Sequence, residues 1–156
     1  MKNKHLPSLE SYIPQEVEIH YKRPLLDTMK YIKNSEDAEN LLRFCINPKR
    51  IDLKEFFIVL LLTNANQILG ISVVSSGSTR GVQINTKEIF QLAIKSNAAA
   101  ILVCHNHPSG TLKISDADKK QTKKIQTLAK LLDITLIDHI IITSESYISF
   151  ADEGIL

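Results

Sequence analysis

The sequence predicts an α/β protein in which one mixed β-sheet is flanked by helices. Short apolar stretches of strand length alternate with segments of helical periodicity. Their order is β-β-α-β-α-β-β, which is typical of a sheet with helices packed on it. With 156 residues, 44% hydrophobic content and 23% charged residues, the chain is long enough to form one domain with a sizeable core.

The first two strands form a predicted hairpin. Residues 54–63 are apolar on both faces of a strand, which favours a central position in the sheet. Asn64-Ala65-Asn66 is a turn signal, and 67–76 forms the returning strand. A polar loop over 75–81 follows.

Two helices alternate with the remaining three strands. The first helix is expected over 86–96, with Thr86 as its N-cap, and the second over 116–132. A buried strand over 98–104 lies between them, and strands over 134–142 and 147–150 follow the second helix. The positions expected to face inward are Ile89, Leu92, Ala93 and Ser96 in the first helix, and Ile125, Leu128, Ala129 and Leu132 in the second.

Residues 1–50 differ in composition from the rest of the chain. They hold four of the five prolines and none of the five glycines. We interpret them as an N-terminal extension with an edge strand at 17–21 and a helix over 35–46, in which Leu41, Leu42 and Phe44 are available for packing. The main domain then occupies 51–156.

Bulk charge and cysteine content restrict the classes of function. A net charge of +2 is too small to indicate a nucleic-acid or membrane partner without a local cluster. The longest apolar run, 56–62, is far shorter than the roughly 20 residues of a membrane span, and no apolar signal-peptide core follows Met1. With Cys45 and Cys104 alone, we expect no disulfide framework and a cytoplasmic location.

Two histidines follow the central buried strand. Side chains two residues apart in an extended chain point the same way, so His105 and His107 share a face, while Cys104 and Asn106 point away from it. Neutral imidazoles suit Zn²⁺, and a carboxylate from the next element completes three protein ligands with one open position. Asp118, in the first turn of the second predicted helix, is the nearest good candidate.

The spacing of these residues resembles a known motif. His105-x-His107, seven residues and Ser115-x-x-Asp118 are similar to the signature of the JAB/MPN/JAMM metallopeptidase domain. The strings at 105–110, 136–141 and 147–150 resemble the RadC family in particular. The resemblance covers the chain from about residue 51, with one departure, Ile114, where that family usually has proline.

The resemblance implies both an architecture and a chemistry. It implies the JAB/MPN fold, which is similar to that of cytidine deaminases, and a Zn²⁺ ion held by His105, His107 and Asp118. It also implies a hydrolase in which metal-activated water attacks an amide carbonyl of a peptide or isopeptide. The family's general base is a glutamate on an upstream strand, and Lys-Glu-Phe-Phe-Ile-Val-Leu matches that strand here, which assigns the role to Glu55. Taken alone, Glu55 is also consistent with a solvated charge.

Ser115 and Asp118 have a second interpretation, since Ser-x-x-Asp before an apolar run is also a helix capping box. The Ser115 hydroxyl can accept a hydrogen bond from the helix backbone while it donates toward the reacting oxygen, so it is a catalytic candidate. Asp118 is expected to serve one of the two purposes, and the spacing to His107 favours ligation over capping alone.

Two further sets of residues each have two possible interpretations. Asp138 and His139 are adjacent in a predicted strand, so at most one of them faces the site and orients a ligand imidazole, and a buried, satisfied pair is the alternative. The lysines of the second predicted helix form either a solvated face or a phosphate-binding one. They are Lys119, Lys120, Lys123 and Lys124.

The leading function is therefore a zinc-dependent hydrolase, and the alternative is a DNA-repair-associated protein that contacts nucleic acid and has no peptidase activity. The lysine-bearing helix has no aromatic residue for base stacking, which argues against that alternative. Longer RadC-like proteins carry a region similar to helix-hairpin-helix DNA-binding modules, and we expect none here because no glycine precedes Gly70.

Two other classes fit the sequence less well. A zinc deaminase needs His-x-Glu and Pro-Cys-x-x-Cys, and neither is present. A non-enzymatic MPN scaffold typically lacks the ligand set that this chain retains. The loops 75–81 and 111–114 are expected to border the cleft.

Overall fold

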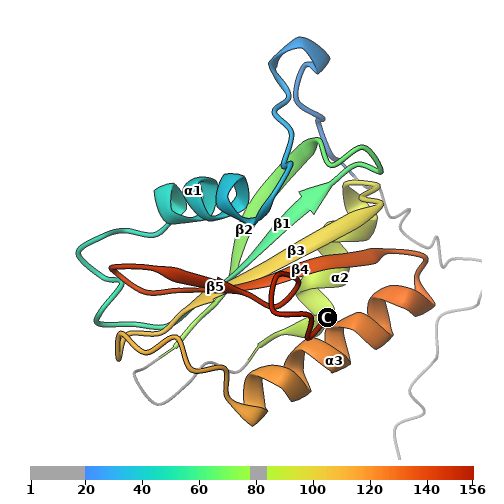
Figure 1. Cartoon of the computed structure of the whole chain (residues 1–156). Helices are drawn as coiled ribbons and strands as arrows, with labels where there is room; N and C mark the ends of the chain where they lie inside the picture. The colour runs from blue at the N-terminus through green and yellow to red at the C-terminus, as the bar shows by residue number, and fades with distance from the viewer. Residues whose placement is uncertain (1–19, 78–83) are drawn as a thin grey trace, which may run out of the picture.

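The computed structural model describes residues 20–77 and 84–156. The predicted mixed sheet and its order of elements are confirmed (Figure 1). The elements are a 3-10 turn at Leu26–Thr28, α1 (Ser35–Cys45), β1 (Phe56–Leu62), β2 (Ile68–Ser76), α2 (Thr86–Lys95), β3 (Ala100–Asn106), α3 (Asp116–Leu131), β4 (Thr135–Ile142) and β5 (Tyr147–Ser149).

The strands lie in the order β2-β1-β3-β4-β5. β1 and β2 form the predicted antiparallel hairpin, and β1 is also antiparallel to β3. β3 and β4 are parallel, and α3 is the crossover between them. Because α3 begins a short loop after β3 and runs back along the sheet, its N-terminal end lies at the C-terminal end of β3.

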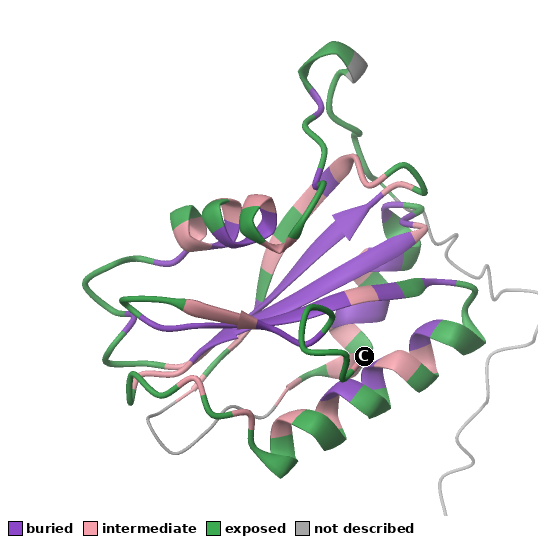
Figure 2. Cartoon of the chain, in the orientation of Figure 1, coloured by how far each residue is buried: buried purple, intermediate pink, exposed green. Residues whose placement is uncertain are grey.

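Helices cover both faces of the sheet, so the domain has three layers (Figure 1). On one face α1 buries Ala38 and Leu42 against β1, β3 and β4. On the other face α2 and α3 pack on the same strands through residues such as Ile89 and Ile125. The central strands β1 and β3 are buried almost throughout, as Figure 2 shows.

Several predicted details of helix packing are wrong. Phe44 is 90% exposed, because α1 turns about 100° per residue and its inward side is occupied by Ala38 and Leu42. Leu132 is also exposed, since it lies beyond the last turn of α3. In α2 the N-cap is Asn85 rather than Thr86, and Phe90, which we did not predict to face inward, is buried.

The N-terminal extension is described only in part. The edge strand expected at 17–21 lies largely outside the described residues, and His20 and Tyr21 have no regular secondary structure. The Tyr21 hydroxyl donates a hydrogen bond to the carbonyl of Leu69 in β2. The division of the chain at residue 50 stays a prediction.

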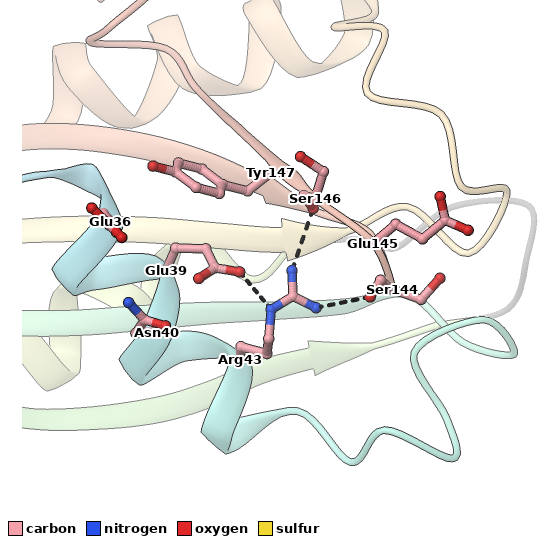
Figure 3. A pocket seen from close by; sticks show the side chains of 8 residues that line it. All are labelled: Glu36, Glu39, Asn40, Arg43, Ser144, Glu145, Ser146 and Tyr147. Atoms are coloured by element: carbon pink, nitrogen blue, oxygen red, sulfur yellow. Dashed lines mark hydrogen bonds and ion pairs between the residues drawn. The ribbon is translucent and has the colours of Figure 1, made fainter.

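Arg43 links α1 by hydrogen bonds to the turn between β4 and β5 (Figure 3). Its guanidinium donates to the carbonyl oxygens of Thr143 and Ser144 in that turn and pairs with Glu39, one helical turn earlier. A hollow of about 440 Å³ lies beside this contact, with Glu36 and Tyr147 in its lining. Because Arg43 is already engaged by these partners, we interpret the hollow as part of the packing of α1.

The sequence also led to expectations about membrane spans and about the two cysteines. Within the described part of the chain, no helix is both long and apolar enough to cross a bilayer. Cys45 and Cys104 are both free thiols. Cys104 is completely buried, as strand alternation predicts, and burial raises its pKa well above the ordinary value.

Candidate metal centre

The end of β3 carries the histidine pair. The strand continues two residues beyond the predicted end and includes His105 and Asn106. His105 is paired in register with Phe57 of β1 and faces the α2 and α3 side of the sheet, while Asn106 faces the other way. The alternation predicted from the sequence therefore holds through the last residues of the strand.

His107 is held by the turn that follows the strand. The backbone N–H of Gly110 donates to the His107 carbonyl, and Gly110 has a φ of +76°, a conformation that glycine adopts without strain. The Nδ1 of His107 lies 2.8 Å from the carbonyl oxygen of Thr111. A carbonyl can only accept, so Nδ1 carries the proton and the Nε2 lone pair of neutral His107 is left free.

Asp118 is delivered by the first turn of α3. Ser115 is the N-cap, and its hydroxyl oxygen accepts from the Asp118 N–H at 3.1 Å. In return, Oδ2 of Asp118 accepts from the backbone N–H of Ser115 at 2.8 Å and from its hydroxyl at 2.5 Å. These bonds form a complete capping box, so the Ser115 hydroxyl proton is directed at Asp118.

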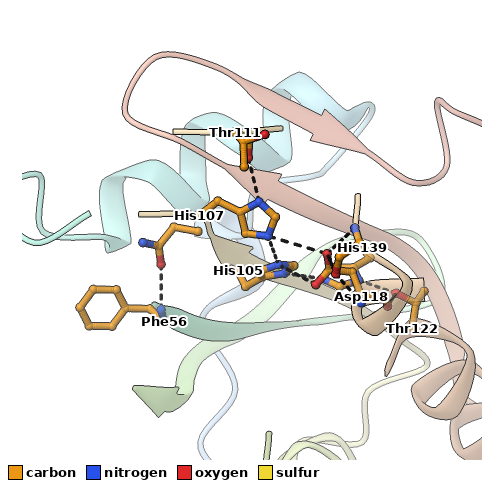
Figure 4. A network of polar contacts seen from close by, with 9 residues as sticks. Phe56, His105, His107, Thr111, Asp118, Thr122 and His139 are labelled. Carbon is orange, nitrogen blue, oxygen red and sulfur yellow. Dashed lines mark hydrogen bonds and ion pairs between the residues drawn. The ribbon is translucent and has the colours of Figure 1, made fainter. Parts of the chain in front are cut away.

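The three side chains converge at one point (Figure 4). His105 Nε2 lies 2.9 Å from His107 Nε2 and 3.2 Å from Asp118 Oδ1, and His107 Nε2 lies 3.8 Å from Asp118 Oδ2. Burial alone raises the pKa of Asp118, but its interactions with His105 and Ser115 outweigh burial and hold that pKa well below the usual range. The carboxylate is therefore ionised at neutral pH.

This group of ligand atoms fits a divalent metal. One atom from each of His105, His107 and Asp118 can be chosen so that all lie within 4.8 Å of one another. Two imidazole nitrogens and one carboxylate oxygen are a ligand set that Zn²⁺ takes in catalytic sites, with a fourth position left for water or substrate. His105 is buried, and the other two side chains are partly exposed, so the group is open on one side.

Glu55 lies next to this group, immediately before β1. Its carboxyl group is half-buried, and burial raises its pKa, while the charges of His105 and His107 act in the opposite direction. Glu55 lies two residues before Phe57, which is paired with His105, so the register of β1 and β3 puts Glu55 at the same end of the sheet as the histidines. A half-buried carboxyl with a raised pKa has the properties of a general base, and that role of Glu55 stays a prediction.

Asn106 fixes the backbone on both sides of Glu55. Its side-chain oxygen accepts from the N–H of Phe56 at 2.8 Å, and its side-chain nitrogen donates to the carbonyls of Ile51 and Lys54 at 2.6 and 2.7 Å. The residue between the two histidines therefore also holds the segment that carries Glu55. We did not predict this contact, because only long-range pairing places residues 51–56 beside β3.

Of the pair in β4, His139 faces the site and Asp138 faces the opposite side. His139 Nε2 lies 2.8 Å from His105 Nδ1. Asp138 accepts hydrogen bonds from the Ser149 hydroxyl and from the backbone N–H groups of His139 and Ala151. The two interpretations of this pair therefore each hold in part. His139 contacts the imidazole of His105, and Asp138 is a buried carboxylate whose hydrogen bonds are satisfied.

Thr122 is a polar residue of the site that we did not predict. It is buried in α3, one turn after Asp118, and its hydroxyl oxygen lies 2.6 Å from His139 Nδ1. Its spacing of four residues from Asp118 on one helix face was the available signal. Of the loops expected to border the cleft, 111–114 contributes the Thr111 contact, whereas 78–81 lies outside the described residues.

Comparison with known proteins agrees with this geometry. The family model described as RadC-like JAB domain matches residues 32–155. A UPF0758 protein of Flavobacterium johnsoniae is 39% identical over 127 residues, which cover 81% of this chain and 54% of that protein. A UPF0758 protein of Haemophilus ducreyi is 33% identical over 132 residues, covering 85% and 59%. Another, from Pseudoalteromonas translucida, is 38% identical over 103 residues, covering 66% and 46%.

The mixed sheet with helices on both faces and a His-His-Asp group at a strand end defines a JAB-type domain. Within that class, the chain belongs to the RadC family. It spans about half the length of the curated relatives that it matches.

Proposed function

We propose that this chain is a zinc-dependent hydrolase of amide or isopeptide bonds. The observation that carries the proposal is the convergence of His105 Nε2, His107 Nε2 and the Asp118 carboxylate beside the half-buried Glu55. The family description as a JAB domain supports it. A group of three ligands with a neighbouring base is the minimum equipment of a metal-assisted hydrolase.

His105, His107 and Asp118 hold the metal in this proposal. When bound, Zn²⁺ acts as a Lewis acid that makes water a competent nucleophile near neutral pH. Asp118 offers Oδ1 toward His105 while Oδ2 stays in the capping box, so the carboxylate does not have to leave the helix cap in order to serve.

Glu55 moves the proton. It takes a proton from the water that attacks the carbonyl carbon, and it delivers a proton to the departing amine as the C–N bond breaks. The products are a carboxylic acid and an amine, which leave as carboxylate and ammonium after the acid's proton passes to the amine, and Glu55 returns to its ionised form. Its burial matches the task, because a raised pKa brings a glutamate closer to the pH at which transfer in both directions is efficient.

Ser115 has a positioning role in this proposal. Its hydroxyl donates to Asp118 Oδ2, so it orients the carboxylate. The direct donation to the reacting oxygen that the motif predicts requires the hydroxyl to rotate away from Asp118, and it stays a prediction.

Two measurements, zinc content and hydrolysis, distinguish the role of the metal ligands from that of the general base. Protein purified without chelator should contain about one zinc per chain by elemental analysis, and His107→Ala should lose it. Glu55→Gln should keep its zinc, while hydrolysis of a responsive peptide or isopeptide substrate falls by about 10² to 10⁴. The proposal fails if the wild type holds no transition metal and added zinc binds His107→Ala equally well. Full activity in Glu55→Gln would assign the base elsewhere, with Asp116 the first candidate.

A further inference from the structure

A line of buried polar contacts runs from the backbone of α3 to the far nitrogen of His105 (Figure 4). The Thr122 hydroxyl oxygen lies 2.6 Å from the carbonyl oxygen of Asp118 and 2.6 Å from His139 Nδ1. On the other side of that ring, His139 Nε2 lies 2.8 Å from His105 Nδ1. His105, Thr122 and His139 are all at most 4% exposed.

The direction of every hydrogen bond in this line follows from its first member. A backbone carbonyl can only accept, so the single hydroxyl proton of Thr122 goes to Asp118. The Thr122 oxygen must then accept, and His139 Nδ1 carries the proton. A neutral imidazole has one N–H and one lone pair, so with the proton on Nδ1 the lone pair of His139 lies on Nε2. His139 Nε2 therefore has a lone pair and accepts from Nδ1–H of His105.

We propose that Thr122 and His139 are positioning residues that select the metal-binding tautomer of His105. With a proton held on Nδ1, His105 can offer the Nε2 lone pair to a metal, and a proton that Nε2 shares with Asp118 in the metal-free protein is the one that the metal displaces. The opposite tautomer places a proton where the metal must bind. The inference deepens the proposed function because it rests on the same metal site, but it concerns how that site is prepared before any metal arrives.

The surroundings of His139 hold the ring in place for this role. It stacks on Phe150 with ring centroids 4.6 Å apart and meets the edge of Phe57 at 5.8 Å. Both of its nitrogens are engaged, one by Thr122 and one by His105. His139 is therefore no fourth ligand of the site in this arrangement.

α3 supplies a matched control. A helical threonine often donates to the carbonyl four residues earlier, with no further consequence. Thr127 does this, with its hydroxyl 2.8 Å from the carbonyl of Lys123, on the exposed side of the helix. Thr127→Val thus removes the same intrahelical bond as Thr122→Val without a histidine nearby, and Thr122→Ser keeps the hydroxyl.

The first measurement is zinc affinity, by competition of metal-free protein with a chromophoric chelator. We expect Thr122→Val to weaken zinc binding about tenfold and His139→Phe by 10-fold to 100-fold, the range for partners that orient metal ligands. Thr122→Ser and Thr127→Val should stay within about twofold of the wild type. Equal affinities of Thr122→Val and Thr127→Val, both folded by circular dichroism, would overturn the inference.

The second measurement reads the tautomers directly, by long-range ¹H–¹⁵N spectra of metal-free protein with labelled histidine. We expect His105 and His139 to carry their protons on Nδ1 in the wild type, and His105 to become a mixture in Thr122→Val. A wild type in which His105 lacks the proton on Nδ1 would overturn the inference. This measurement needs neither zinc nor substrate, so it decides the inference even if the protein binds no metal and the proposed function fails.

Discussion

At the scale of single residues, Asp118 is placed for two roles that the sequence presents as alternatives. The pattern Ser-x-x-Asp is the same for a capping box and for the last part of the metal motif, and spacing cannot say which oxygen goes where. In the structure Oδ2 accepts both bonds from Ser115, while Oδ1 faces His105. A carboxylate has about four lone-pair sites, so the two roles do not compete.

The partial burial of Glu55 has a consequence for stability. Because burial raises its pKa, the folded state holds the proton more tightly than the unfolded chain does. The contribution of Glu55 to stability is therefore fully present below its unfolded pKa and is lost as the pH rises through its folded pKa. At neutral pH the fold contains a carboxylate that is less well solvated than in the unfolded chain.

We accordingly expect Glu55→Gln to raise the unfolding temperature of the metal-free protein at neutral pH. The advantage should shrink as the pH falls to about 4, where an ordinary glutamate becomes protonated. Thermal unfolding monitored by circular dichroism at both pH values measures this, and Glu145→Gln, at an exposed position, is the control. A Glu55→Gln protein that is less stable than the wild type at neutral pH contradicts the interpretation.

At the scale of elements, period-two alternation predicted the faces of β3 correctly but could not decide those of β4. The pairing of β3 with β4 shifts between Ile101 and Leu102, because Ile137 is an extra residue in β4. A bulge of one residue exchanges the two faces of a strand from that point onward. It is this bulge that turns His139 toward α3 and Asp138 away, and no local feature of the sequence marks it.

Asn106 joins two strands at the point where the site is built. Its three hydrogen bonds are all buried or partly buried and all go to the backbone around Glu55. Loss of the side chain leaves two carbonyls and one N–H without their partner, and each such group costs about 1 to 3 kcal/mol.

We expect Asn106→Ala to lower the free energy of unfolding by about 2 to 4 kcal/mol, since water can replace part of the lost bonding. Amide hydrogen exchange should accelerate in residues 51–56, and Phe56 N–H should lose protection first. Urea unfolding and exchange measured by mass spectrometry test both expectations. Asn40→Ala, at an exposed position of α1, should change stability by less than about 0.5 kcal/mol. An equally small effect of Asn106→Ala would contradict the stabilising role of the three Asn106 hydrogen bonds.

At the scale of the whole molecule, the site depends on the topology of the sheet. Glu55 precedes β1, and His105 and His107 lie at and just after the end of β3. The start of α3 places Asp118 at the same end of the sheet. The order of elements was predictable because apolar runs and helical periodicity alternate clearly. The exposure of Phe44 and Leu132 was not predictable in this way. An apolar side chain can be buried or exposed, and its position around and along the helix decides which of the two it is.

The two functions that the sequence left open differ at the same scale, since nucleic-acid binding depends on a continuous charged surface. Lys119, Lys120, Lys123 and Lys124 are all exposed on α3, but the chain as a whole has a net charge of only +2. Asp116 lies in the first turn of the same helix and weakens the field of the lysines.

We therefore expect the wild type to bind duplex DNA no more tightly than about 10⁻⁶ M at physiological salt, which is the range of non-specific attraction. Replacing the four lysines by glutamine should change that affinity little and leave zinc content unchanged, because none of them is a proposed ligand. Fluorescence anisotropy over a series of salt concentrations measures both the affinity and its salt dependence. If the lysines do contact phosphates, each lost contact should reduce the slope of log affinity against log salt by about 0.9. Tighter wild-type binding, with a slope that falls in the four-lysine variant, would favour the nucleic-acid function over the hydrolase.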